Sequence, residues 1–112
     1  MAGTFELKAT ANEKFHFVLK AGNGEVILQS QQYTTHDAAL NGIESVRKNA
    51  VADDNFERKA DKAGSPFFVL KAGNGQVIGQ SESYSSNSAM ENGIASVMKN
   101  APDAKLKDVS QN

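Results

Sequence analysis

The pattern of apolar and polar residues indicates three short β-strands near the start of the chain. Residues 4–8 alternate between apolar and polar, which is typical of a strand that buries one face, and Phe15, Phe17 and Leu19 share one face of the second stretch, residues 15–19. The third stretch, residues 25–30, is the returning strand. Polar residues 10–14 separate the first two stretches, and Gly22-Asn23-Gly24 separates the second from the third. Asn-Gly between alternating segments favours a tight hairpin, because both residues tolerate positive φ. The pattern predicts a three-stranded antiparallel meander.

After Tyr33 the period changes to that of an amphipathic helix. Thr34 or Thr35 can cap its start, and Asp37 in the first turn suits the positive end of the helix dipole. Gly42 lies in mid-helix, where Gly costs about 1 kcal/mol relative to Ala, so it indicates close packing against the sheet or against a second helix. The apolar stripe follows the i, i+4, i+7, i+11 spacing of one helix face and comprises Ala39, Ile43, Val46 and Ala50.

The whole β-β-β-α pattern occurs twice. Residues 5–50 align without a gap with residues 56–101, at an offset of 51, and about half of the aligned positions are identical. The longest shared run, Phe17–Gly24, returns as Phe68–Gly75. Such duplication has to be recognised before any fold is assigned. A piece of about 50 residues is marginal alone, so the two repeats are expected to share one core.

The second repeat predicts the same elements in the same order. Its strands are expected at residues 56–60, 66–72 and 76–81, and its helix, capped by Ser85 or Ser86, at residues 88–100. The predicted fold class is α+β: two tandem β-β-β-α repeats forming one pseudo-two-fold body, with an antiparallel sheet and two helices packed against it.

The domain organisation follows from this duplication. Residues 1–112 are expected to form a single domain, in which residues 5–50 and 56–101 are the repeats and residues 102–112 form a C-terminal tail. Residues 105–109 of the tail either add a short strand that closes the second repeat or fray. The predicted core comprises Phe5, Phe17, Leu19, Val26, Ile43 and Val46 with Phe56, Phe68, Leu70, Val77, Ile94 and Val97, and Leu28 adds to the first half alone because Gly79 is its counterpart.

The amino-acid composition excludes several kinds of binding and catalytic site. The net charge is −1 and the pI is about 6.1, so no overall field recruits nucleic acid or an anionic membrane. The chain has no Cys, which excludes disulfides, thiolate metal sites and cysteine nucleophiles. No signal peptide or membrane-spanning run is present, which favours a cytoplasmic location. Its two histidines, His16 and His36, lack metal-ligand spacing, and we expect neither a metal nor another cofactor.

A Ser-x-x-Tyr element lies where the third strand of each repeat meets the helix. In a structural role, the serine hydroxyl would cap the strand end and the tyrosine ring would cover the edge of the core. Two such corners on a pseudo-symmetric body can instead line one cleft, to which helix asparagines add hydrogen-bonding groups. The predicted binding site therefore comprises Ser30, Tyr33, Asn41, Ser81, Tyr84 and Asn92.

Two alternatives to a binding module have some basis in the sequence. The neighbours His36 and Asp37 are an acid–base pair in principle, which would suit a small enzyme, although a solvated polar helix start explains them more simply. A weak single-stranded nucleic-acid surface would need lysines interleaved with aromatic rings. The rings are needed for the core, and glutamates dilute the basic strip of Lys20, Lys48, Lys71 and Lys99 with Phe15, Phe17, Phe67 and Phe68.

Three motifs, each present in both repeats, resemble the YegP-like family of small bacterial proteins. The motifs are Phe-x-Leu-Lys-Ala-x-Asn-Gly, Gln-Ser-x-x-Tyr and Asn-Gly-Ile-x-Ser-Val-x-Lys-Asn-Ala, and they run from Phe17 to Ala50 and from Phe68 to Ala101. The resemblance implies a fused pseudo-dimer of β-β-β-α units, and it supplies no activity and no catalytic or ligand residues to carry over. Gly79 opposite Leu28 departs from exact two-fold symmetry.

We therefore expect a small, non-enzymatic binding or protein-interaction module. Its partner would be a protein or a small polar ligand. Because two copies of the unit are fused in one chain, we expect a monomer, with weak dimerisation through unpaired sheet edges as the alternative.

Overall fold

The computed structural model describes residues 3–110 and contains the two predicted β-β-β-α repeats. The first helix begins directly after Thr35, one of its two predicted caps, and the second begins one residue before its predicted start. The caps are Thr35 and Ser86, whose hydroxyls accept hydrogen bonds from the backbone N–H groups of Ala38 and Ala89. In chain order the elements are β1 (Thr4–Ala9), β2 (Phe15–Lys20), β3 (Val26–Gln29), α1 (His36–Asn49), the 3₁₀ turn η1 (Asp53–Asn55), β4 (Phe56–Ala60), β5 (Pro66–Lys71), β6 (Val77–Gln80), α2 (Asn87–Asn100) and β7 (Lys105–Asp108).

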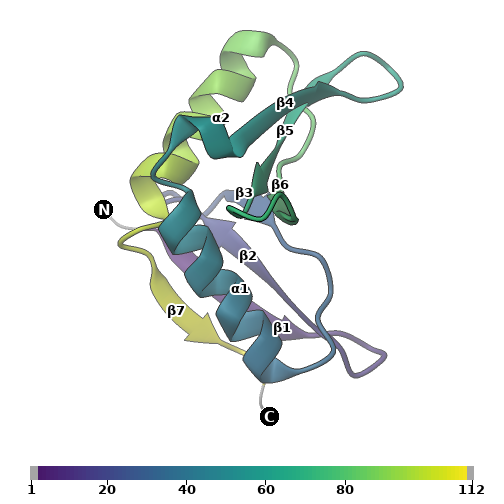
Figure 1. Cartoon of the computed structure of the whole chain (residues 1–112), viewed down its shortest axis with the longest axis vertical. Coiled ribbons are helices and arrows are strands. Elements are labelled where there is room, and N and C mark those ends of the chain that lie inside the picture. Colours follow the sequence, from purple (N-terminus) through teal and green to yellow (C-terminus); the bar gives the residue numbers. More distant parts are fainter. Residues whose placement is uncertain (1–2, 111–112) are drawn as a thin grey trace.

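The strands form one seven-stranded sheet in the order β4-β5-β6-β3-β2-β1-β7. The two meanders meet in the middle, where β3 and β6 run antiparallel and pair through Gln29 and Gln80. Helix α1 contacts β2 of its own repeat and also β5 and β6, while α2 contacts β5 and also β3. Each helix therefore covers strands of both repeats (Figure 1), and the α+β pseudo-two-fold fold predicted from the sequence is confirmed.

The tail does form a strand, β7, but this strand extends the sheet at the first repeat and not, as predicted, at the second. β7 pairs with β1, and the pairing is parallel, so the sheet is not wholly antiparallel. The N–H of Lys105 donates to the carbonyl of Gly3 (3.0 Å), and that of Val109 donates to Leu7 (2.9 Å). The reason is the crossing of the helices: Asn100 at the end of α2 lies against Gly3, just before β1. The chain that leaves α2 therefore meets the edge of the first repeat.

Both predicted hairpin turns are present, but their backbone conformation differs from the predicted one, in which the Asn and the Gly both tolerate positive φ. Of the residues in the two Gly-Asn-Gly turns, only Gly24 and Gly75 have positive φ, at 88° and 87°. A left-handed glycine at the end of a turn produces a β-bulge in the strand that follows. The pairing of β2 with β3 accordingly shifts register between Leu19, opposite Leu28, and Lys20, opposite Val26.

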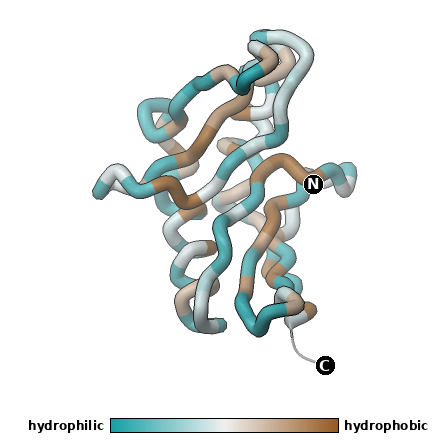
Figure 2. The backbone as a smooth tube through the Cα atoms, turned by 90° about the vertical axis from the view of Figure 1, so that its right-hand side faces the viewer, coloured by the Kyte–Doolittle hydropathy of each residue, from teal (hydrophilic) through white to brown (hydrophobic). Residues whose placement is uncertain are grey.

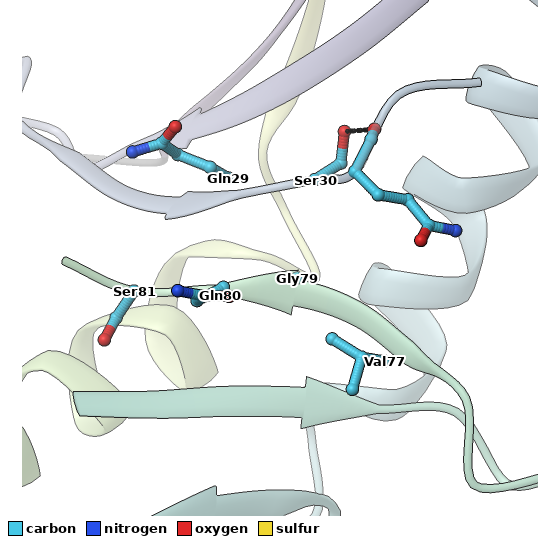
Figure 3. Close-up of a pocket in the computed structure, with 7 residues that line it drawn as sticks. Gln29, Ser30, Val77, Gly79, Gln80 and Ser81 are labelled. Atoms are coloured by element: carbon cyan, nitrogen blue, oxygen red, sulfur yellow. Dashed lines mark hydrogen bonds between the residues drawn. The ribbon is translucent and has the colours of Figure 1, made fainter. Parts of the chain in front are cut away.

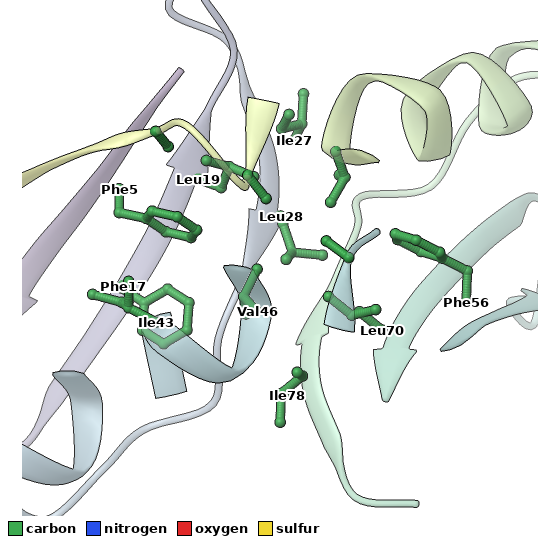
Figure 4. Packing of buried hydrophobic residues seen from close by; sticks show 14 of the residues in the cluster. Phe5, Phe17, Leu19, Ile27, Leu28, Ile43, Val46, Phe56, Leu70 and Ile78 are labelled. Atoms are coloured by element: carbon green, nitrogen blue, oxygen red, sulfur yellow. The ribbon is translucent and has the colours of Figure 1, made fainter. Parts of the chain in front are cut away.

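This bulge also corrects the predicted core. Val26 and Val77 are 36% and 39% exposed, whereas Ile27 and Ile78 are buried. Simple alternation assigns the wrong residue to the buried face, because the bulge inserts one extra residue on the returning strand. Leu7, which was not predicted, is fully buried. The other predicted core residues are buried in one cluster with side chains from both repeats (Figure 4).

Hydrophilic residues occupy the projecting loops, and the hydrophobic stretches lie in the body of the molecule (Figure 2). Within residues 3–110, neither helix is long and apolar enough to cross a membrane.

One asymmetric contact lies at the centre, where the repeats meet. Leu28 is 1% exposed and lies between the side chains of the two repeats (Figure 4). A Cβ at Gly79 would approach its Cγ to 2.7 Å, closer than two carbon atoms pack. Since Gly79 is the counterpart of Leu28, only one leucine side chain fits at the junction.

We predict that Gly79→Leu destabilises the fold by about 1–3 kcal/mol, because a second leucine overpacks this junction. Leu28→Gly should cost more than about 2 kcal/mol, because it leaves a cavity in the core. The exchange variant Leu28→Gly with Gly79→Leu should recover a large part of the summed loss. Denaturant unfolding of all four proteins measures this coupling, and additive losses would contradict it.

Candidate functional site

The two predicted serines hold the backbone of their own repeats. The Oγ of Ser30 accepts a hydrogen bond from the N–H of Phe17 (2.9 Å) and donates one to the carbonyl of Gln31 (2.7 Å). Ser81 repeats the arrangement with Phe68 (3.0 Å) and Glu82 (2.7 Å). Each hydroxyl thus has its proton engaged and already accepts one hydrogen bond, which is the structural role considered for these corners.

The two predicted tyrosines explain the glycines in the middle of the helices. The ring of Tyr33 stacks on Phe17, with centroids 6.1 Å apart, and Tyr84 stacks on Phe68 at 6.2 Å. A Cβ on Gly42 would collide with the Tyr33 hydroxyl, and a Cβ on Gly93 would collide with that of Tyr84. It is therefore a tyrosine side chain, rather than the sheet backbone or the other helix, that requires glycine here.

The same burial determines the protonation of these hydroxyls. Desolvation raises the pKa of Tyr33 above its usual value, and it does the same for Tyr84, where the charges of Glu82 and Glu25 act in the same direction. Both phenols therefore stay protonated at neutral pH and can serve as hydrogen-bond donors or acceptors, not as phenolate nucleophiles.

Ser30 and Ser81, one from each predicted corner, line one groove. The groove lies at the junction of β3 and β6 and has a volume of about 360 Å³ (Figure 3). Its lining does not include the predicted tyrosines or asparagines. The remaining lining residues are Gln29, Gln31, Val77, Gly79 and Gln80.

The two predicted asparagines lie in a different pair of clefts. Each cleft is formed by the hairpin turn of one repeat and the helix of the other. The first cleft, of about 540 Å³, lies between Ala21-Gly22-Asn23 and the α2 residues Asn92, Ala95, Ser96, Lys99 and Asn100. The second cleft, of about 460 Å³, lies between Ala72-Gly73-Asn74 and the α1 residues Asn41, Glu44, Ser45, Lys48 and Asn49. Tyr84 and Asn92 also line a smaller hollow beside the first cleft.

The two clefts correspond residue for residue under the repeat offset, with the single difference that Ala95 replaces Glu44. Elsewhere on the accessible helix surface the repeats have diverged. The differing pairs include His36/Asn87, Asp37/Ser88, Leu40/Glu91 and Arg47/Met98. The polar helix residues that the two repeats share are therefore concentrated on the face that lines the clefts.

Packing accounts for some of these shared residues and not for others. The side-chain amide of Asn49 donates to the carbonyl of Ser45 (2.8 Å), and Asn100 donates to Ser96 in the same way. Asn41, Asn92, Lys48 and Lys99 are exposed. Their side chains take part in none of the hydrogen bonds and ion pairs found among residues 3–110, so no internal contact explains why both repeats carry them.

His36 meets a partner that the sequence did not indicate. Its Nε2 lies 2.6 Å from Oδ2 of Asp108 in β7, and its ring packs edge-on against Phe15. Hydrogen bonds from Ser110 and then from His36 lower the pKa of Asp108 to about 2. Asp37 is exposed in the first turn of α1. Because the position of β7 could not be predicted, the only pairing visible in the sequence was His36 with Asp37.

The residues proposed for single-stranded nucleic acid are largely committed elsewhere. Phe17 and Phe68 are fully buried and cannot stack on bases. Lys20 pairs with Glu6 (3.2 Å), and Lys71 pairs with Glu57 (2.8 Å). No group of three or more His, Cys, Asp or Glu side chains that could hold a metal ion occurs in the described part of the chain.

Comparison with known proteins places the chain among relatives of the same length. A family model described as a domain of unknown function (DUF1508) matches twice, at residues 10–57 and 61–108. The UPF0339 protein of Shewanella oneidensis is 48% identical over 98% of this chain and 100% of its own length. The UPF0339 protein YegP of Yersinia pestis is 50% identical, over 96% of each chain. Neither name states an activity.

Solved structures agree with the fold. The solution NMR structure of the UPF0339 protein SO3888 from S. oneidensis matches with a TM-score of 0.92 at 48% identity, covering 98% of this chain and 93% of that one. The NMR structure of yegP from E. coli, a protein of unknown function, matches with a TM-score of 0.94 at 45% identity, covering 100% and 97%. The resemblance drawn from the sequence motifs is confirmed.

We predict that Gly42→Ala destabilises the protein, although the same change in an ordinary helix interior stabilises it by about 1 kcal/mol. The cause is the collision with the Tyr33 hydroxyl, so Tyr33→Phe should relieve part of the loss when the two changes are combined. Thermal or denaturant unfolding of the single and double variants measures this. A stabilised Gly42→Ala protein would contradict the packing role of the tyrosine.

Proposed function

Since this chain belongs to the DUF1508 family of UPF0339 (YegP-like) proteins, we propose a function from its own geometry: it is a non-enzymatic binding module with two equivalent polar clefts. The observation that carries the proposal is the set of exposed residues shared by both repeats. Asn41 with Lys48 and Asn92 with Lys99 have no internal partner among residues 3–110, yet both pairs face a hairpin of the opposite repeat.

The cleft chemistry suits a small polar ligand. Each cleft offers an ammonium group, carboxamide side chains that donate and accept hydrogen bonds, and a serine hydroxyl. Since a lysine ammonium is a mobile point charge, it can meet a carboxylate of a zwitterionic or weakly acidic ligand. Glu44 in the second cleft already pairs with Arg47 (3.2 Å). The ligand class we propose is therefore neutral or zwitterionic polar metabolites, such as sugars or amino acids.

The two clefts offer a general base unequally: the second contains the carboxylate of Glu44, which is paired with Arg47, and the first has Ala95 in its place. The lining of the first cleft includes neither a histidine nor a carboxylate that could act as a general base for Ser96. The small-enzyme hypothesis, which needs His36 with Asp37, gains no support from the contact of His36 with Asp108. A monomeric state, a cytoplasmic location and a protein partner stay predictions of the sequence.

The proposal predicts that a pool of sugars, amino acids and nucleosides shifts amide NMR signals at the clefts. Shifts are expected at Asn23, Asn74 and the helix faces opposite them, in both repeats. The variant Asn41→Ala with Asn92→Ala should weaken binding of the active compound by about tenfold or more, the loss of about 1.4 kcal/mol or more, because it removes one amide from each cleft.

The matched control is Asp37→Asn with Ser88→Ala, which changes exposed helix residues that differ between the repeats and lie outside the clefts. It should leave binding unchanged. Shifts confined to the central groove of Ser30 and Ser81, or no shifts with any compound in the pool, would overturn the cleft proposal.

A further inference from the structure

A further hollow adjoins the first hairpin, and the tail helps to build it. β7 runs beside β1 with Lys105 opposite Thr4 and Lys107 opposite Glu6. The hollow has a volume of about 440 Å³. We call it the lysine pocket, and its lining comprises Thr4, Glu6, Lys20, Ala21, Gly22, Gly24, Lys105 and Lys107.

The local charge of this pocket is opposite in sign to that of the whole chain. The chain has a net charge of −1, whereas the pocket brings three lysines together against one glutamate. That carboxylate is already shared, because Glu6 pairs with Lys20 and also with Lys8, each at 3.2 Å. Hydrogen bonds from Lys8 and then from Lys20, opposed by partial desolvation, lower the pKa of Glu6. Lys105 and Lys107 therefore leave an excess of positive charge.

The equivalent place in the second repeat lacks this excess. Glu57 pairs there with Lys71 (2.8 Å) and Lys59 (3.7 Å), which repeats the ion pairs of Glu6. However, β4 is the outer strand of the sheet, so no further strand brings lysines beside it. The single tail thus makes a basic pocket at one hairpin out of two, and the second hairpin is a natural control.

Side chains specific to the first repeat hold the tail in this position. His36 contacts Asp108, and Arg47 donates a hydrogen bond to the carbonyl of Ala104 (2.6 Å). Their counterparts in the second repeat are Asn87 and Met98. Two of the positions at which the first repeat differs are therefore those that fix the strand carrying Lys105 and Lys107.

We propose that the lysine pocket binds a phosphate-type anion. Lysines act as flexible point charges and can approach a tetrahedral, multiply charged group from several directions, whereas a planar carboxylate is matched best by an arginine fork. The hydroxyl of Thr4 adds a hydrogen-bond donor, and Gly22 and Gly24 present no side chain that would block the approach. The lysine pocket shares only Ala21 and Gly22 with the first cleft, and the proposal does not rest on the clefts, since it uses neither their asparagines nor Lys99.

The test is an amide NMR titration of the full chain with pyrophosphate at constant ionic strength, with acetate as the comparison anion. Saturable shifts are expected at Thr4, Gly22 and Gly24, without matching shifts at Gly73 and Gly75. Lys105→Gln with Lys107→Gln should weaken pyrophosphate binding about tenfold or more, because two of the three attracting charges are lost.

Two further variants make the result specific. Lys20 lies on β2 and not on the tail. Lys20→Gln therefore tests the loss of charge without changing β7, and it should weaken pyrophosphate binding. Lys71→Gln, its counterpart at the second hairpin, should leave pyrophosphate binding unchanged. Asn41→Ala with Asn92→Ala should also leave it unchanged, which separates this proposal from that of the clefts. Equal shifts at both hairpins, equal binding of acetate, or no weakening by Lys20→Gln would overturn the lysine pocket.

Discussion

The fold depends on how two incomplete units share one junction. A three-stranded meander with one helix is too small to bury a full core, and here the two meanders meet through the pairing of Gln29 with Gln80. Pairing through a single pair of residues contributes little stability by itself. The junction is completed by Leu28, whose side chain occupies the space beside Gly79, and by helices that each cover strands of both repeats.

That crossing also creates the candidate sites. Because each helix extends over the opposite repeat, its exposed face meets the opposite hairpin, and the clefts are lined by residues of both units. A single repeat contains the asparagine, the lysine and the hairpin, but its helix residues do not lie beside its own hairpin. The same crossing carries the end of α2 to Gly3 and so sends the tail along β1. The packing of the two repeats at the junction thus determines where the polar side chains of the clefts and of the tail lie.

The sequence predicted everything that follows from local periodicity and from the repeat. The helix stripes and the three strands of each unit follow from side-chain patterns, and each helix cap, Thr35 or Ser86, is one of the two residues that the sequence offered. The exposure of Val26 did not, because a left-handed Gly24 shifts the phase of the next strand by one residue. The pairing of His36 with Asp108, 72 residues away, and the pairing of asparagines with opposite hairpins depend on the crossing, which no local pattern encodes.

The duplicated chain separates two kinds of surface residue. Residues kept in both copies without a hydrogen-bond or ion-pair partner among residues 3–110, such as Asn41 and Asn92, lie where the two-fold arrangement provides two equivalent places. Residues present in one copy, such as His36 and Arg47, contact the tail, and a chain has only one C-terminal tail for its two sheet edges. The residues that line the two equivalent clefts and the residues that hold the tail therefore occupy different positions of the same repeat. Since the strand after α2 pairs with β1 and not with β4, it gives the two fused repeats an asymmetry that their shared residues do not have.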